Sequence, residues 1–514
     1  MLIVSFASIL ILNLSQAQAA IVACPPLGSI IANVTSSSTP QTLDAWATKR
    51  ASDAQTRIEN KFAATSTKIA GATEAAPVDP KGEYQYLWIR DNAIVETEVQ
   101  KRRDIVANYI EFCKSNLSTK TLGGLGEPKF NPDGTAFNLP WGRPQNDSSA
   151  YRALRWMDEV DYQLGLGKTD IAKTHYSPDL NNFSLKWDLE YIARNWNSPS
   201  FDLWEEEQGI NTHTLDIIHS ALERGATLAK RFEPLGAKSP AYLKYTAEAA
   251  NINKYLTSNA WDAENSYLRS TMVHQGGFVD KQQPLDMGTI IGVLHSAAAN
   301  PKGNLVFKIS DDRVMATMAK AEKTFSDLYQ VNQRFQDPKY LGAAALGRYA
   351  EDIFHGGNPW MITTQTGAEY YYRLGNELAS QKSFTITATN LALYARLGDP
   401  TIAALPVGTV VKQSSAMQKK IVTAIKNKGD AYLELIRELT PADGIPSEQI
   451  GRGYKPGDQG PWVSNYLDMT SSVGGADVAR AGGEPLGAFD LTWNDASFLS
   501  LLRARNLLAS HLTQ

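Results

Sequence analysis

Apolar residues recur at intervals of three and four along most of the chain. Clear stripes of this kind run through residues 215–229, 314–328 and 498–502. This spacing gathers apolar side chains on one face of a helix, whereas the strict alternation of a half-buried strand is scarce. The pattern therefore predicts an all-α protein.

The segments between these stripes contain many tryptophan, arginine, aspartate and glutamate residues. They cover residues 84–91, 123–147, 202–209, 347–360 and 443–449. Functional groups carried on long loops above a rigid scaffold are typical of an enzyme.

The N-terminus has the features of a secretory signal peptide over residues 1–19. An apolar run reaches Leu14, and small residues precede a cleavage point near Ala19, although a basic n-region is missing. The run is short for a transmembrane helix. Residues 21–24, IVAC, could instead form a bacterial lipoprotein box. We predict a secreted, extracellular protein, which would be periplasmic or lipid-anchored if its source is bacterial.

The rest of the chain, residues 20–514, is expected to form one large domain. No Ser/Thr-rich linker divides it after residue 41, and the last apolar stripe lies close to the C-terminus. We therefore expect no appended binding module. We expect a monomer with no membrane partner.

Composition and charge narrow the functional classes. The chain is 43% hydrophobic and 20% charged, which excludes a disordered composition. Its formal net charge is −4, and lysine and arginine are scattered without runs, so no nucleic-acid partner is expected. Cys113 lies on a helical apolar stripe and fits a buried thiol, although a disulfide with Cys24 is possible in an oxidising compartment. Sequons for N-glycosylation begin at Asn33, Asn116, Asn146 and Asn182.

The loops show no signature of a metal or cofactor site. The seven histidines lack metal-ligand spacing, and no nucleophile elbow or phosphate-binding loop occurs. Instead, carboxylates lie close to indoles, and this combination suits the apolar faces and the hydroxyl groups of sugars. For any single pair, an ordinary core tryptophan is the simpler explanation. The pairs are Trp88 with Asp91, Trp141 with Asp147, Trp204 with Glu205, and Trp493 with Asp490.

The segment FDLWEEEQG, residues 201–209, could supply a catalytic acid. Glycoside hydrolysis needs one protonated and one ionised carboxyl group across the scissile bond. Packing against an indole removes water from the charged form of a glutamate and so favours its protonated form. Composition alone leaves an exposed acidic turn equally possible.

Several long sequence blocks follow one another along the chain and span nearly all of its mature part. They are YQYLWIRDNA (84–93), GLGEPKFNPDGTAFNLPWGRPQNDSSAYRA (124–153), DLEYIARNWNSPSFDLWEEEQG (188–209), GRYAEDIFHGGNPW (347–360), PSEQ (446–449) and FDLTWNDASFL (489–499). In this order, the blocks closely resemble the glucoamylases of glycoside hydrolase family 15. The resemblance implies an (α/α)6 barrel, in agreement with the helical pattern. It also implies release of β-D-glucose from the non-reducing ends of starch-like α-glucans, with inversion.

The resemblance implies a role for each glutamate of the triple run. Glu205 matches the general acid, and Glu206 matches a ligand of substrate hydroxyls. Glu207 matches no functional position, so we expect a solvated turn residue. Glu448 in PSEQ matches the general base that activates water. Inversion requires a separation of about 6.5–9.5 Å between the two catalytic carboxyl groups, which leaves room for that water.

Further positions match substrate contacts of the family. Trp360 follows Pro359 and fits equally well a residue that packs its loop. The implied contacts are Tyr84 and Trp88 at subsite −1, Arg90 and Asp91 at the terminal glucose, Trp141 beside the acid and the sugar, Gln145 with a hydrogen bond directed outward, Trp204 directly before the acid, Arg348 in contact with sugar and carboxylates, and Trp360 and Trp493 as aromatic platforms.

The chain departs from the family pattern at the rim of the expected pocket. Phe354 stands where the fungal enzymes commonly have tyrosine, and the stretch from Glu448 to Asp490 carries the insert IGRGYKPGDQGPW. No starch-binding domain is expected, so dextrins and malto-oligosaccharides are better candidate substrates than raw starch. Two alternatives remain open: a related hydrolase such as a glucodextranase or trehalase, and a non-catalytic glucan-binding or regulatory protein.

Overall fold

The computed structural model of the protein describes residues 41–77, 82–178, 182–233, 240–455, 457–459, 461–470 and 480–513. The expected signal peptide, the possible lipoprotein box, Cys24 and Asn33 lie outside these residues. Spatial contacts separate Met1–Thr42 from a unit formed by Leu43–Gln514, and this unit contains all the elements that follow.

Within the described residues, six helices contact one another in a closed ring. Each contacts the next in chain order, and the last returns to the first. They are α2 (Ile89–Glu96), α4 (Asn146–Gly165), α7 (Thr212–Phe232), α9 (Met287–Ala299), α11 (Met361–Ser380) and α17 (Thr492–Thr513).

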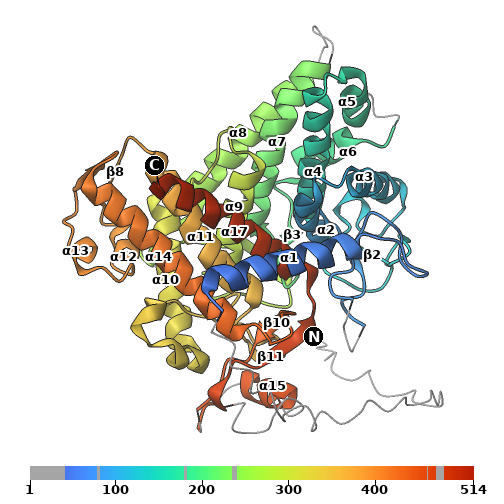
Figure 1. The fold of residues 1–514 in the computed structure, drawn as a ribbon. Coiled ribbons are helices and arrows are strands. Elements are labelled where there is room, and N and C mark those ends of the chain that lie inside the picture. The colour runs from blue at the N-terminus through green and yellow to red at the C-terminus, as the bar shows by residue number, and fades with distance from the viewer. Residues whose placement is uncertain are drawn as a thin grey trace, which may run out of the picture. The chain divides into compact units, whose positions relative to one another are not determined.

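A second set of helices packs on the outside of this ring (Figure 1). Because these helices alternate in sequence with those of the ring, the fold is the (α/α)6 barrel, and the all-α prediction is confirmed. The outer helices are α1 (Leu43–Lys61) on α17, α3 (Arg103–Ser118) on α4, α6 (Leu185–Asn195) on α4 and α7, α8 (Ala241–Asn259) on α7, α10 (Asp312–Leu328) on α9, and α14 (Ala416–Leu439) on α11.

The remaining elements are short and lie mostly in the connections. The short α-helices are α5 (Thr169–Tyr176), α12 (Leu391–Tyr394), α13 (Pro400–Ala403) and α15 (Pro461–Thr470), and the 3₁₀ turns are η2 (Thr97–Val99), η3 (Gly124–Gly126), η4 (Gln330–Phe335), η5 (Pro338–Tyr340) and η6 (Phe354–Gly356). The antiparallel strand pairs are β1 (Leu87–Trp88) with β2 (Lys129–Phe130), β5 (Trp261–Asp262) with β6 (Tyr267–Leu268), β8 (Ser383–Thr385) with β9 (Val410–Lys412), and β10 (Ser447–Ile450) with β11 (Pro485–Phe489). One three-stranded sheet joins β3 (Ser200–Phe201), β4 (Glu207–Asn211) and β7 (Thr271–Gly277).

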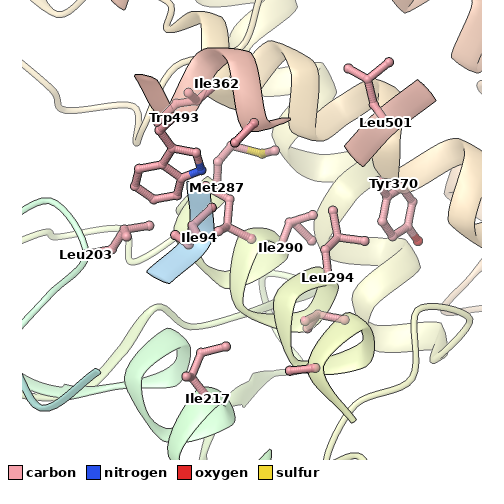
Figure 2. Packing of buried hydrophobic residues seen from close by; sticks show 14 of the residues in the cluster. Ile94, Leu203, Ile217, Met287, Ile290, Leu294, Ile362, Tyr370, Trp493 and Leu501 are labelled. Carbon is pink, nitrogen blue, oxygen red and sulfur yellow. The ribbon is translucent and has the colours of Figure 1, made fainter. Parts of the chain in front are cut away.

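The hydrophobic core fills the ring of inner helices. Figure 2 shows Ile94 of α2, Ile217 of α7, Ile290 of α9, Ile362 of α11 and Trp493 of α17 gathered in one cluster. An inner helix is covered on both sides, and every residue of α2 is accordingly buried. An outer helix such as α10 buries one stripe, as the spacing of its apolar residues predicts.

Burial bears on two expectations from the sequence. Cys113 is buried, as its apolar stripe predicts, and among the described residues, which do not include Cys24, it is a free thiol. Asn116 and Asn146 are also buried, whereas Asn182 is exposed, so only Asn182 among the described sequons is accessible to a glycan. None of the described helices combines the length and apolar character needed to cross a bilayer.

Candidate active site

Glu205 lies at the tip of a tight turn between β3 and β4. The carboxylate of Asp202 accepts hydrogen bonds from the backbone N–H groups of Glu206, at 2.9 Å, and Glu207, at 3.1 Å. Glu205 itself adopts a left-handed backbone conformation with φ +66°. Such a conformation raises the energy of a residue with a side chain. It also gives Glu205 a different direction from that of Glu206 and Glu207.

The Glu205 carboxylate is held by three donors from elsewhere in the chain. Its Oε1 accepts from Trp88 Nε1 at 2.8 Å and from Gln145 Nε2 at 2.8 Å. Its Oε2 accepts from Trp141 Nε1 at 3.0 Å. The side chain remains 16% exposed. The structure thus brings three of the predicted site residues to one carboxyl group that solvent can still reach.

Arg90 lies on the inner side of the same cluster. Its Nη1 donates to Gln145 Oε1 at 3.0 Å and to Asp147 Oδ2 at 2.9 Å, and its Nη2 lies 3.7 Å from Glu205 Oε1. Burial raises the pKa of Asp91 to about 6, and the adjacent Arg90 partly opposes this shift. Asp147 was predicted only as a neighbour of Trp141, and the structure shows that it fixes Arg90.

Glu448 lies on β10 and is 2% exposed. Burial raises its pKa to about 7, although hydrogen bonds from the Tyr84 hydroxyl and from Gln449 Nε2, at 3.1 Å, favour the carboxylate. Burial, followed by the charge of Glu448 and its hydrogen bond, raises the pKa of Tyr84 well above its ordinary value. The charge of Glu205 acts on Tyr84 in the same direction. Tyr84 is therefore a protonated donor within the field of both predicted catalytic carboxylates.

Glu206 faces a different set of groups from Glu205. Its Oε1 accepts from Arg348 Nη2 at 2.9 Å, and its Oε2 accepts from the Tyr349 hydroxyl at 2.6 Å. Arg348 is oriented by two hydrogen bonds to Asp352, each 2.7 Å long. Burial raises the pKa of Glu206, and Arg348 opposes that shift. Tyr349 and Asp352 are missing from the sequence prediction. Residues 348–352 form a turn and not a helix, so the four-residue spacing of Arg348 and Asp352 gives no signal of the pair.

Aromatic rings surround the Arg348 guanidinium. Its Cζ lies 5.5 Å from the ring of Trp204, 5.1 Å from Phe354 and 4.9 Å from Trp360. Trp360 is buried, and its indole N–H finds no hydrogen-bond partner among the described residues. Trp204 and the predicted platform Trp360 thus lie together, with their ring centroids 5.7 Å apart, on the side of the site that holds Arg348 and Glu206.

Trp493 occupies a different environment. It is buried in the barrel core, and its ring lies 6.1 Å from His295 (Figure 2). Such surroundings are typical of a core residue. The role of Trp493 as a sugar platform therefore stays a prediction.

The segment that follows the insert packs against the loop of Phe354. Helix α15 packs against η6, which begins at Phe354. A Cβ at Gly356 would lie 2.7 Å from Cβ of Tyr466 in α15. Helix α15 therefore fits closely against the loop that carries Phe354.

The expectation of a solvated Glu207 is wrong. This residue is 1% exposed, and its carboxylate accepts from Thr271 Oγ1 at 2.6 Å. The ammonium of Lys281 lies 3.6 Å from Glu207 and 2.7 Å from both Asp202 and Asp286. Pairing of β4 with β7 covers Glu207, so its carboxylate belongs to a buried charge cluster beneath the catalytic turn.

One group of side chains within the described residues has the spacing of metal ligands. Ligand atoms of Glu207, His274 and Asp280 all lie within 4.8 Å of one another. His274 Nδ1 is 3.3 Å from Glu207 Oε1, which is also the distance of a hydrogen bond. A cation here would have to bind beside the Lys281 ammonium, and this arrangement disfavours a metal centre.

The sequence model of glycosyl hydrolases family 15 matches residues 49–503. The chain belongs to this family. It is 29% identical over 481 residues to Glucoamylase-1 of Schizophyllum commune, an alignment that covers 90% of this chain and 74% of the relative. It is 28% identical over 491 residues to a glucoamylase of Blastobotrys adeninivorans, with coverage of 90% and 72%. The solved glucoamylase of Hormoconis resinae superposes with a TM-score of 0.74 at 26% identity, over 90% of this chain and 74% of that one.

This family 15 protein is accordingly a glycoside hydrolase of the glucoamylase type. The family match includes both the turn at Glu205 and the strand at Glu448. Glu205, which Trp88, Trp141 and Gln145 hold, and Glu448, which accepts from Tyr84, are therefore the candidate carboxyl groups for its chemistry.

Proposed function

We propose that this protein is a secreted, monomeric glucan 1,4-α-glucosidase that releases β-D-glucose from the non-reducing ends of α-1,4 glucans and, more slowly, α-1,6 glucans. The observation that carries the proposal is the environment of the two glutamates. Glu205 is a partly exposed carboxyl group fixed by three donors, and Glu448 is a buried one that accepts from Tyr84. Such a pair supplies the acid and the base that glycoside hydrolysis requires.

Each carboxyl group has a defined task in the proposed reaction. Glu205 donates a proton to the glycosidic oxygen as the bond to the leaving sugar breaks. Glu448 accepts a proton from the attacking water, which reaches the anomeric carbon from the opposite side and inverts it. Arg90 and Asp91 bind the terminal glucose, and Glu206 binds further hydroxyl groups.

Soluble dextrins and malto-oligosaccharides are the proposed substrates, and no metal or cofactor takes part. All the described elements between Glu205 and Glu448 belong to the barrel or to its connecting loops. A related family specificity, that of a glucodextranase or a trehalase, would depend on the rim, where Phe354 and the insert depart from the family pattern. Initial rates on maltose, isomaltose, trehalose and starch distinguish these activities.

Proton NMR of the first product from a maltodextrin tests the proposed reaction. The early product should be β-glucose alone, because exo cleavage releases single glucose units and inversion produces the β anomer. Early α-glucose would contradict inversion, and early longer oligosaccharides would contradict exo action.

Substitutions within the triple glutamate test the assignment of the acid. Glu205→Gln should lower kcat by at least about 10³-fold, since general acid catalysis and its placement are both lost. Glu207→Gln is the matched control, two residues away, and should retain most activity. Undiminished glucose release by Glu205→Gln would refute the assignment and would also revive a non-catalytic interpretation of this carboxyl group.

A further inference from the structure

Lys129 lies inside a box of four aromatic rings. Its Nζ is 3.2 Å from the ring centroid of Trp141, 4.2 Å from Phe137, 4.4 Å from Tyr86 and 4.5 Å from Trp88. The residue is only 1% exposed. All four distances are within the range of cation–π attraction.

The four rings, here called the aromatic box, form a closed circuit around the ammonium. Tyr86 contacts Trp88 at 6.2 Å, Trp88 contacts Trp141 at 6.1 Å, Trp141 contacts Phe137 at 6.0 Å, and Phe137 contacts Tyr86 at 5.0 Å. Each pair meets edge to face. Such contacts fix the tilt of each ring relative to the next.

Two walls of the aromatic box are the two indoles that donate to Glu205. Trp88 donates to Oε1 and Trp141 donates to Oε2. Trp88 lies directly opposite Lys129 in the β1–β2 ladder, so the backbone sets their relative position. The ammonium and the Glu205 carboxylate therefore act on the same two rings, the first on the ring faces and the second on the N–H groups.

A lysine can be buried without an aromatic box around its ammonium. Lys68 is also buried, and its ammonium donates to the backbone carbonyls of Ala63, Ile69 and Ala72. Burial lowers the pKa of both lysines to about 8. Lys68 stabilises its loop through backbone carbonyls, whereas Lys129 contacts the two indoles that donate to the predicted acid.

We propose that Lys129 is a positioning residue for the general acid, because its ammonium holds Trp88 and Trp141 in the orientation in which both donate to Glu205. The inference rests on the proposed role of Glu205. It adds Lys129 to the groups that position this carboxyl group. Without the ammonium, either indole can rotate out of line with the carboxylate, and the acid loses its fixed position at the scissile bond.

Lys129→Met tests the proposal, since it removes the charge and keeps an unbranched side chain. We expect kcat to fall about 10-fold with KM within about 2-fold, because the loss concerns placement of the acid rather than binding of the sugar. Lys129→Arg should retain more activity than Lys129→Met, since it keeps a cation among the rings. Lys68→Met is the matched control and should lower the melting temperature without this loss of kcat.

A double-mutant cycle separates positioning from a purely structural role. If Lys129 acts through the indoles, Lys129→Met should cost much less in a Trp141→Phe background, where one N–H donor is already absent.

The outcomes distinguish this inference from the proposed function. A loss in Lys129→Met no greater than in Lys68→Met, or an equal loss with and without the Trp141 indole, would refute positioning while Glu205→Gln remained inactive. Full activity of Glu205→Gln would refute the proposed function itself. If Lys129→Met fails to fold, Phe137→Leu opens one wall of the aromatic box without removing the ammonium or a donor. It should then lower kcat with little change in KM, and an unchanged kcat would refute positioning.

Discussion

The hydroxyl group of Tyr84 donates a hydrogen bond to the buried carboxylate of Glu448. This bond stabilises the ionised form of a group whose pKa burial raises to about 7. Tyr84→Phe should therefore raise that pKa further. Since the base must be ionised, the acid limb of the kcat/KM profile should move to higher pH by about one pH unit, the equivalent of one charge-assisted hydrogen bond.

A second tyrosine provides the control for this experiment. Tyr349 donates to Glu206 at 2.6 Å, so Tyr349→Phe also removes a hydroxyl group from a carboxylate of the site. Only Tyr84→Phe should move the acid limb, because Glu206 is not the proposed base. An equal displacement in both variants, or none in Tyr84→Phe, would contradict the assignment of Glu448.

Burial of Glu448 also links activity to stability. In the unfolded chain its pKa is the ordinary 4.5, whereas burial raises the pKa to about 7 in the folded protein. The carboxyl is neutral in both states below pH 4.5, and above pH 7 folding must bury a charge. As the pH rises from 4.5 to 7, the free energy of unfolding therefore decreases by up to about 3 kcal/mol.

Glu448→Gln should consequently be inactive but more stable than the native protein at pH 8, with little difference at pH 4. Melting temperatures at both pH values test this expectation. Equal stability of the two proteins at pH 8 would show that the buried carboxylate carries no such cost.

The sequence predicts the scaffold well, because helical spacing of apolar residues depends on neighbours three or four positions away. The resemblance also brings Trp88, Trp141 and Gln145 to the site where they meet Glu205. Glu207 shows the limit of that approach. Its burial depends on β7, where Thr271 lies 64 residues further along the chain, and no local pattern indicates that pairing. The aromatic box around Lys129 likewise arises only when β1, β2 and the loop of Trp141 meet.

The buried charge cluster beneath the catalytic turn is unequal in charge. Lys281 contacts Asp202, Glu207 and Asp286 at once, and all four residues are buried. These carboxylates raise the pKa of Lys281 against the effect of burial. Lys281→Met would leave three buried carboxylates without their counter-ion and should destabilise the protein by about 3–5 kcal/mol.

Glu207→Gln should cost far less than Lys281→Met. Glutamine can still accept from Thr271, and Lys281 keeps its two 2.7 Å contacts. Urea unfolding of the two variants measures the difference. If Lys281→Met loses no more stability than Glu207→Gln, the ammonium does not hold this cluster together.

Gly487 on β11 lies against the carboxylate of Glu448. A Cβ there would lie 2.5 Å from Glu448 Oε2 and 3.2 Å from its Cβ. Gly487→Ala should therefore displace the proposed base and lower kcat by at least about 10-fold, given how steeply catalysis depends on position. The backbone at Gly487 has φ +74°, so the substitution also carries a conformational cost of about 1–2 kcal/mol.

Gly444 separates these two effects. Its φ is +76°, but a Cβ there would meet nothing within 4 Å. Gly444→Ala should thus lose a similar amount of stability and keep its activity. Steady-state kinetics and urea unfolding of both variants compare the two positions. Activity lost equally in both would attribute the effect to backbone strain, whereas loss in Gly487→Ala alone shows that catalysis depends on the space this glycine leaves for Glu448.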